Sequence, residues 1–543
     1  MMRSDVRRAV FLCFALLLAV LAMALLRFHS RRSADLYPAG TLPPISFWYW
    51  HSPFVLSPDD TKTLQDLGVR ELFVRAATLT YSGDPNDPVR ASLRQTWPAP
   101  PKVKTSVAAN TAFHLQIHLV FPVDATLVRR FEGLPEETFA QSMVQAIETE
   151  WQRAAMQMPG AIVGVQIDLD CPTRLLGRYA AVLKRVRSRL PRTNALSITL
   201  LTSWYDSRRL RGLLDAVDFS VPQFYEAQTS TTRSQFHPIS NLSRLPRRLH
   251  QAAQLEKPFF VGLPIYGHAL VYDGTGRLRG LFHDASAADL LARPHDFRFL
   301  GAAPLNEQGQ DAKVPEAFIG EERVEFGPAR AGTAFQLTYD LPTPDLLRRH
   351  LERLRAERLP RTCRGIILYR FPERGQEAVL PLATVAAVVQ GNPPQPNVQL
   401  QVRTRRTAAF DLVESPQPGP PRTDLYVTVI NSGTGPSRVA PDAVTVDLRF
   451  QKAQLETARL GTFNDLEGFA GVPEARASVA RADTLRYRVT HLAPGERRIL
   501  GPVTLIARPS ATVSAQWRVV LPGGFDTLRK NILPVLLTPG KGK

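Results

Sequence analysis

The segment GVQIDLDCPT, residues 164–173, is the stretch of this sequence that decides the fold. Its apolar and polar residues alternate, which is typical of a β-strand. Alternation places Gln166, Asp168 and Asp170 on one face of that strand. Carboxylates on a strand between two helical segments must be paired, hydrogen-bonded or protonated. The pair is equally consistent with a functional carboxylate cluster and with a hydrogen-bonded pair that closes a strand-to-helix turn.

Strand-like and helix-like segments alternate on both sides of this stretch. The expected strands are residues 45–51, 71–76, 113–121, 164–173, 195–201, 217–225, 259–264 and 365–369. The expected helices are residues 57–68, 135–158, 173–190, 206–214, 241–254, 344–357 and 378–389, with an irregular insertion at 268–340. Eight strands with helices between most of them predict a (β/α)8 TIM-like barrel over residues 45–390. An open doubly wound sheet is the alternative, although no Gly-rich phosphate loop follows an early strand.

Functional residues of such a barrel gather at the carboxyl ends of its strands. The candidates at those positions are Trp50, Arg75, Asp170, Trp204, Tyr225, Glu226, Tyr266 and Tyr369. His118, on the polar face of the third strand, and Gln223, on the sixth, complete the expected substrate-binding set. Any one of these aromatic residues, taken alone, is better explained by barrel packing. Together with the acids they indicate a sugar site, because aromatic rings stack on sugar C–H faces and carboxylates bind hydroxyls or transfer protons.

Composition narrows the function classes. The net charge is +18, but the sequence contains no basic helix with interleaved aromatic residues and no nucleic-acid motif, so we expect no nucleic-acid partner. We expect instead a basic surface that faces an anionic envelope. Cys171 and Cys363 lack metal-ligand spacing and fall at opposite rims of the predicted barrel, so we expect free thiols and no metal or other cofactor.

The amino terminus predicts a membrane segment. Ala9–Leu26 is an uninterrupted apolar run flanked by arginines, and as a helix it would span about 27 Å. It is either a signal peptide or an uncleaved anchor, and we expect an anchor followed by a linker up to residue 44. The rest of the chain is then exported, facing the periplasm or the cell exterior. The flanking charges do not set the orientation.

The carboxyl-terminal part has almost no helical periodicity. A linker at residues 391–397 precedes strand-like segments at 425–430, 443–450, 485–489, 499–506 and 512–520. Strands and turn signals at this spacing predict a β-sandwich over residues 398–540. By analogy, such a module binds or positions a ligand more often than it catalyses a reaction.

Four motifs resemble a bacterial family catalogued as domain of unknown function 3142. They are Phe47–His51, Gln166–Pro172, Ser197–Thr199 and Val221–Tyr225. The resemblance covers roughly residues 45–390 and implies no established activity.

The fourth strand is also distantly similar to that of the family 18, chitinase-like, glycoside hydrolases. Their motif there reads Asp-Gly-x-Asp-x-Asp-x-Glu, and Asp168 and Asp170 match its second and third acids. The family's first acid falls on Val165 and its catalytic Glu on Pro172. Residues 223–226 and 262–267 are similar to the family's sixth-strand and seventh-strand motifs, and Tyr369 stands where the family has the Trp under the sugar.

The departure at Pro172 decides what the resemblance implies. In the family that Glu protonates the leaving oxygen while the substrate's acetamide attacks, and proline has no proton to give. One interpretation is a glycoside hydrolase with another acid pair, Asp170 with Glu226, and Asp168 beside them. The other is a catalytically inactive barrel that binds glycan, and an envelope scaffold is a third class. Each implies a carbohydrate or envelope partner and no cofactor.

Overall fold

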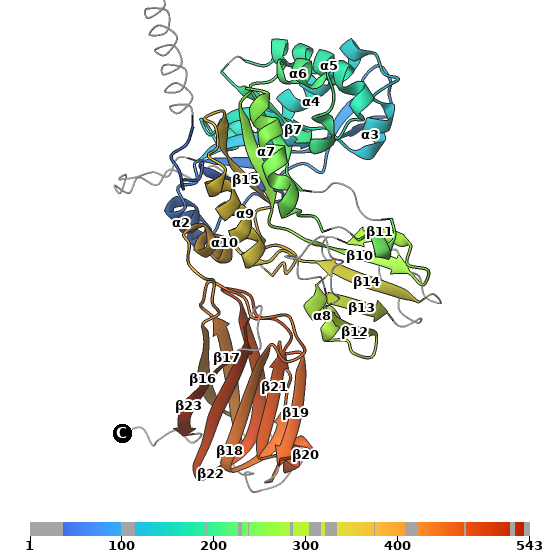
Figure 1. Ribbon diagram of the computed structural model, residues 1–543. Coiled ribbons are helices and arrows are strands. Elements are labelled where there is room, and N and C mark those ends of the chain that lie inside the picture. The colour runs from blue at the N-terminus through green and yellow to red at the C-terminus, as the bar shows by residue number, and fades with distance from the viewer. Residues whose placement is uncertain are drawn as a thin grey trace, which may run out of the picture.

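The computed structural model describes residues 36–98, 115–191, 193–225, 231–236, 238–282, 286–302, 316–320, 334–373, 375–407, 422–471, 474–521 and 527–536. Three parts follow one another: a strand-and-helix barrel, a small sheet inserted in it, and a carboxyl-terminal β domain (Figure 1). The predicted anchor, Ala9–Leu26, lies outside the described residues. Within those residues, we find no helix of the length and apolarity that a membrane crossing requires.

Eight parallel strands close into a barrel, which confirms the predicted fold class. In chain order they are β1 (Ile45–Tyr49), β2 (Glu71–Arg75), β5 (Gln116–Pro122), β6 (Ile162–Asp168), β7 (Ala195–Leu201), β8 (Phe219–Gln223), β9 (Phe259–Pro264) and β15 (Cys363–Tyr369). Strand β1 pairs with both β2 and β15, which closes the ring. The third barrel strand begins at Gln116, because Leu115 carries no strand geometry and residues 113 and 114 lie outside the described part.

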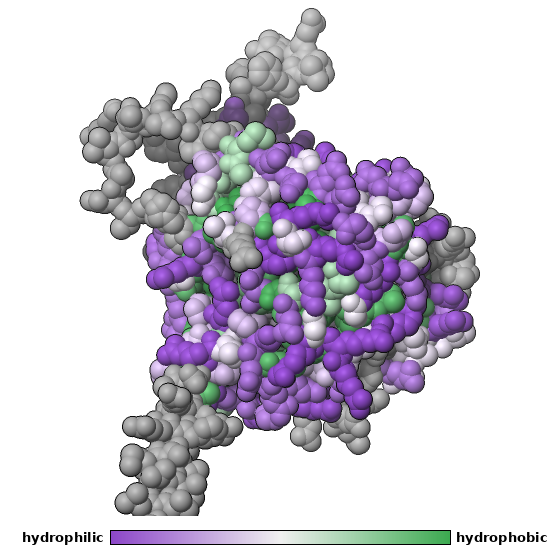
Figure 2. Space-filling model, turned by 90° about the horizontal axis from the view of Figure 1, so that it is seen from above, coloured by the Kyte–Doolittle hydropathy of each residue, from purple (hydrophilic) through white to green (hydrophobic). Residues whose placement is uncertain are grey.

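Helices surround the barrel as the sequence predicts. They are α2 (Pro58–Asp66), α3 (Ala125–Arg130), α4 (Glu136–Gln157), α5 (Leu176–Arg189), α6 (Leu210–Leu214), α7 (Leu245–Gln254), α9 (Pro344–Ala356) and α10 (Leu382–Val389). Helix α2 begins with a capping box, in which the Ser57 hydroxyl and the Asp60 carboxylate satisfy each other's backbone N–H groups, and Pro58 occupies its first turn. Between β2 and β5 the described residues form a hairpin, β3 (Thr78–Tyr81) and β4 (Val89–Ser92). Seen from above, the outer face of the molecule is mostly hydrophilic, with apolar residues in small separate patches (Figure 2).

The barrel is filled by side chains, so it is a packed core. Trp48, Phe73, Phe219 and Phe260 are among the interior residues, and glycines make room for the largest of them. A Cβ on Gly262 would lie 3.1 Å from the Trp48 ring and 2.8 Å from the Pro222 carbonyl oxygen. Alternating large and small interior residues therefore fix how tightly the strands approach one another.

The insertion between β9 and β15 is not irregular, as the sequence suggested, but a five-stranded antiparallel sheet. Its strands are β10 (His268–Asp273), β11 (Leu278–Phe282), β12 (Phe297–Ala302), β13 (Glu316–Gly320) and β14 (Phe335–Asp340), with helix α8 (Ala287–Leu291) against them. The strand order is β11-β10-β14-β13-β12. Its own small core contains Val271, Phe318 and Tyr339, which are fully buried.

The carboxyl-terminal part is an all-antiparallel β domain. Its strands are β16 (Val398–Thr407), β17 (Arg422–Asn431), β18 (Val444–Ala458), β19 (Asp465–Ala470), β20 (Ala475–Ala477), β21 (Thr484–Val489), β22 (Arg497–Val520) and β23 (Thr527–Leu536). They form one continuously hydrogen-bonded sheet around a single apolar core, since the long β22 pairs with β17, β18 and β23. The structure therefore shows an antiparallel β domain with one hydrogen-bonded sheet, and the predicted β-sandwich stays a prediction.

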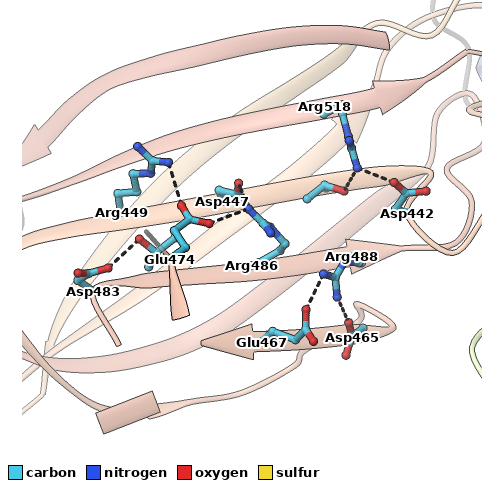
Figure 3. Close-up of polar contacts among 12 residues, drawn as sticks. Asp442, Asp447, Arg449, Asp465, Glu467, Glu474, Asp483, Arg486, Arg488 and Arg518 are labelled. Carbon is cyan, nitrogen blue, oxygen red and sulfur yellow. Dashed lines mark hydrogen bonds and ion pairs between the residues drawn. The ribbon is translucent and has the colours of Figure 1, made fainter. Parts of the chain in front are cut away.

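Ion pairs across neighbouring strands cover a face of this domain (Figure 3). Arg486 on β21 lies opposite Asp447 on β18 and bonds both of its carboxylate oxygens, at 2.7 and 2.9 Å. Arg488 pairs with Glu467 at 2.5 Å and with Asp465. Each exposed pair contributes less than about 1 kcal/mol, so their main effect is on strand register.

Candidate functional site

Two carboxylates stand where β6 leaves the barrel. Interior-facing positions of β6 alternate, so Gln166 lies within the barrel, Asp168 at its rim and Asp170 just beyond it. The Asp168 Oδ1 atom accepts a hydrogen bond of 2.6 Å from the Thr199 hydroxyl on the neighbouring strand β7. Asp168 is half-buried, whereas Asp170 is exposed. The acid pair therefore has one member fixed by the barrel and one open to solvent.

The pKa values of both acids are raised. Burial, followed by the nearby Asp170 charge, raises the pKa of Asp168 from 3.8 to about 7, against the lowering effect of the Thr199 hydrogen bond. Although Asp170 reaches solvent, the surrounding protein removes enough water from its carboxyl to raise its pKa as well. Near neutral pH Asp168 is therefore partly protonated, and a carboxyl that keeps a proton at this pH meets a requirement of general acid catalysis.

Three tyrosines and a tryptophan form an aromatic cluster at the same end of the barrel. Tyr369, at the end of β15, lies with its ring centroid 4.8 Å from Tyr266, 6.2 Å from Tyr225 and 5.4 Å from Trp50. None of the three tyrosine hydroxyls is hydrogen-bonded to a residue in the described part of the chain. These rings and hydroxyls thus form a surface with both apolar faces and free polar groups.

This cluster and the acids belong to one neighbourhood. The Asp168 charge raises the pKa of both Tyr225 and Tyr369, although burial is the larger cause in each, and the pKa of Tyr369 reaches about 12. All of these residues lie at the carboxyl ends of strands of the same closed ring. The sequence prediction of acids and aromatic residues at one mouth therefore agrees with their placement.

Arg75 stands at the end of β2, which only strand β5 separates from β6. Its backbone carbonyl accepts a hydrogen bond of 3.2 Å from Gln95, a buried residue that also donates to the His51 carbonyl at 2.6 Å. Burial lowers the pKa of Arg75, and the neighbouring Arg370 lowers it further. A positively charged group thus lies at the same mouth as the acids of β6, two strands away from them.

A polar layer closes the barrel directly beneath the acids. The Trp48 indole N–H donates to Gln166 Oε1 at 2.7 Å, and Gln166 Nε2 donates to the Ser197 hydroxyl at 3.4 Å. All three are buried. Because these groups satisfy one another, they form a floor and do not extend the site deeper into the barrel.

Two predicted substrate-binding residues lie away from the mouth. His118 is 3% exposed and stacks on Phe73 near the amino ends of the strands, with its Nε2 3.4 Å from the Glu71 carboxylate. Trp204 is 1% exposed and belongs to the core between barrel and helices, where its indole donates to the Cys171 carbonyl at 3.2 Å. Gln223 is half-buried at the end of β8, and Glu226 lies outside the described residues.

Three contributors to the mouth were missed by sequence reasoning. Thr199 could have been predicted from strand alternation, since it faces the barrel interior on β7, the strand next to that of Asp168. Arg370 follows Tyr369 directly. Asp340 comes from the insertion and lies near Tyr266, and burial raises its pKa to about 7 while it accepts a backbone hydrogen bond from Ile239 at 2.6 Å. No local pattern marks Asp340, because only the tertiary fold brings β14 to the barrel.

The remaining titratable groups indicate no other chemistry at this end. No group of three or more potential metal ligands occurs among the residues described. Cys171 and Cys363 are free and buried, as expected, and burial raises the pKa of each thiol to about 12, which makes both unreactive. Acids, aromatic faces and the two arginines Arg75 and Arg370 are therefore what the mouth offers to a ligand.

Solved structures to which this chain is similar include proteins described as a spore cortex-lytic enzyme and as chitinases. The spore cortex-lytic enzyme SleL of Bacillus megaterium is 11% identical, with a TM-score of 0.37 over 66% of this chain and 75% of that one. A family 18 chitinase of Cycas revoluta, in complex with an N-acetylglucosamine tetramer, is 10% identical, with a TM-score of 0.39 over 64% and 98%. The carboxyl-terminal domain of a Desulfitobacterium hafniense protein described as a putative chitinase is 12% identical, with a TM-score of 0.40 over 64% and 100%.

Sequence comparison gives one family. No curated protein is similar enough to this chain to count as a match. Residues 125–297, which include the acid pair and strands β6 to β9, match the profile of the family described as domain of unknown function (DUF3142).

Proposed function

We propose that the protein is an exported glycoside hydrolase that acts on a polysaccharide or a cell-envelope glycan. The observation that carries the proposal is the Asp168–Asp170 pair, with a pKa near 7 for Asp168, at the same barrel mouth as the aromatic cluster. Acids with raised pKa values beside aromatic faces are what glycosidic bond cleavage requires.

The acid pair has the spacing that substrate-assisted hydrolysis needs. In the chitinase-like family the last two acids of the motif are separated by one residue, and the substrate's own acetamide supplies the nucleophile. Asp168 and Asp170 have that separation two residues earlier in the strand, and Pro172 stands at the family's acid position. We assign proton donation to Asp170, which is exposed, and orientation of the acetamide to Asp168, which Thr199 holds in place. Glu226 stays a predicted alternative partner of Asp170.

The aromatic cluster would position the sugar for this step. Tyr266 and Tyr369 meet nearly perpendicularly, at 85°, so a pyranose ring stacked on one of them meets the edge or hydroxyl of the other. Their free hydroxyls can donate to sugar oxygens without breaking a bond within the protein. The apolar run Ala9–Leu26 supports the proposed export. A fusion of residues 1–44 to alkaline phosphatase tests it, since that enzyme is active only outside the cytoplasm.

A second candidate is glycan binding without cleavage. Pro172 favours it, because the residue at the family's proton-donor position has no proton to transfer. Both candidates use the same mouth, so they differ only in whether a bond is broken.

Fluorogenic N-acetylglucosamine oligosaccharides separate the two candidates. The wild-type chain should release the fluorophore, and Asp170→Asn should lower kcat by about 10²- to 10⁴-fold with the fold intact. Asp215→Asn is the matched control, because Asp215 is an exposed carboxylate paired with Lys257 at 2.6 Å. Saturable binding with no release by the wild type would establish the binding candidate. The absence of both, with these oligosaccharides and with the acidic glycans described below, would overturn the proposed function.

A further inference from the structure

Arg75 is a cation without a counter-ion at the mouth of the barrel. It is half-buried, and its Nε atom is shielded from solvent without a hydrogen-bond partner. Across the described residues, the Arg75 side chain makes no hydrogen bond or ion pair. Taking a charge out of water without pairing it costs several kcal/mol in general. A purely structural role does not explain why the fold holds an arginine there.

The surroundings of Arg75 add to that cost. Strand register places Val74 beside Tyr49 and Trp48 beside Tyr369, so Arg75 lies next to Trp50 and two strands from Tyr369. Arg370 lies close enough for its charge to act on Arg75, and its Nη2 donates to Gln376 at 3.5 Å. Two guanidinium groups of like charge are thus held on one side of the aromatic cluster. The acids Asp168 and Asp170 belong to β6, which only β5 separates from β2, yet neither forms an ion pair with Arg75 in the described part of the chain.

Resting on the proposed function, we propose that Arg75 binds a carboxylate carried by the glycan. The guanidinium fork matches a carboxylate in two parallel hydrogen bonds, and Trp50 and Tyr369 beside it offer the sugar an apolar face. The sugar carboxylate would supply the missing counter-ion, while the acids of β6 reach the glycosidic bond. The net charge of +18 favours the same class of polymer, because it raises the local concentration of anionic chains.

A sugar carboxylate has two common sources, and four probes distinguish them. One is the ring carboxylate of a uronic acid, which a hyaluronan oligosaccharide, in which glucuronate alternates with N-acetylglucosamine, tests against its neutral methyl ester. The other is the lactyl ether of muramic acid, which a muramic-acid-containing oligosaccharide tests against an N-acetylglucosamine oligomer of equal length. Calorimetric titration of the full-length chain should show at least one acidic probe binding about 10-fold more tightly than its neutral counterpart. The acidic probe that binds more tightly identifies which sugar carries the carboxylate.

Variants of Arg75 then connect the preference to this side chain. Arg75→Gln should remove the preference and leave binding of the neutral probe unchanged, and Arg75→Lys should keep only part of it, since lysine lacks the fork. Arg449→Gln, an exposed arginine of the β domain paired with Glu474 at 3.1 Å, should bind like the wild type. Because Arg75 has no partner to lose, Arg75→Gln should unfold at the same or a higher temperature. If it does not fold, Arg75→Lys decides.

The outcomes are distinct. Equal affinity of the wild type for acidic and neutral probes, or a parallel loss of both in Arg75→Gln and Arg75→Lys, overturns the carboxylate proposal and leaves the proposed function standing. Failure of all four probes to bind overturns the proposed function and this inference with it.

Discussion

Replacing Asp168 by asparagine should change how the stability of the barrel depends on pH. A pKa of about 7 in the folded state, against an ordinary value of 3.8, corresponds to about 4 kcal/mol in favour of the protonated form. The folded state therefore binds more protons than the unfolded state between these two values. Stability must fall as pH rises through this window and level off above pH 7. Between pH 5 and pH 8 the wild type should lose about 2–3 kcal/mol from this group alone.

Asp168→Asn removes that loss. The asparagine oxygen can still accept the Thr199 hydrogen bond, so the variant's stability relative to wild type should rise by about 2–3 kcal/mol from pH 5 to pH 8. Asp340, which also has a pKa of about 7, is present in both proteins and cancels in the difference. Urea unfolding followed by tryptophan fluorescence measures it, because every tryptophan except Trp517 precedes residue 390.

The control and the refuting result are clear. The pKa of Asp215 is lowered by its hydrogen bond to Lys257, so it titrates below this window, and Asp215→Asn should show no change relative to wild type between pH 5 and pH 8. Parallel pH profiles for wild type and Asp168→Asn would show that Asp168 is an ordinary carboxylate. The assignment of a raised pKa to Asp168 at the barrel mouth would then be wrong.

Two further predictions concern packing and the tyrosine hydroxyls. Gly262→Ala should cost about 1–3 kcal/mol of stability, because the new Cβ would lie 2.8 Å from the Pro222 carbonyl oxygen, whereas Gly212→Ala, with nothing within 4 Å, should be neutral or stabilising in thermal unfolding. Equal effects of both would contradict the packing argument. Tyr369→Phe should weaken glycan binding about 2- to 10-fold without a change in melting temperature. Tyr49→Phe should lower the melting temperature and leave glycan binding unchanged, since the Tyr49 hydroxyl accepts a hydrogen bond from the Val55 N–H at 3.1 Å. A melting temperature lowered by Tyr369→Phe would refute the assignment of a free hydroxyl to Tyr369.

The fold was predictable where local chemistry and periodicity agree. The capping box of Ser57 and Asp60 marks the start of α2, and alternation within residues 164–173 marks β6. The insertion could not be read in this way, because its strands pair across long stretches of sequence, as β10 does with β14. Its sheet is defined by those pairings and not by a continuous local pattern.

The site was predictable to the extent that alternation along a strand determines which face each side chain is on. Tyr225, Tyr266 and Tyr369 meet as expected because each stands at the carboxyl end of a barrel strand. Trp204 does not join them, since a 3-10 turn after β7 carries it outward into the helical layer. His118 faces the barrel interior, but it lies near the amino end of β5 and not at the carboxyl end. Alternation predicts which face of a strand a side chain is on, but not how far along the barrel axis it lies.

The most direct measurement of the central claim is a crystal structure of Asp170→Asn with a bound N-acetylglucosamine oligosaccharide. The account predicts a sugar ring against Tyr266 and Tyr369, with the glycosidic oxygen about 3 Å from the side chain of residue 170. A glycan bound elsewhere on the barrel, or one whose glycosidic oxygens lie far from residues 168 and 170, would contradict it.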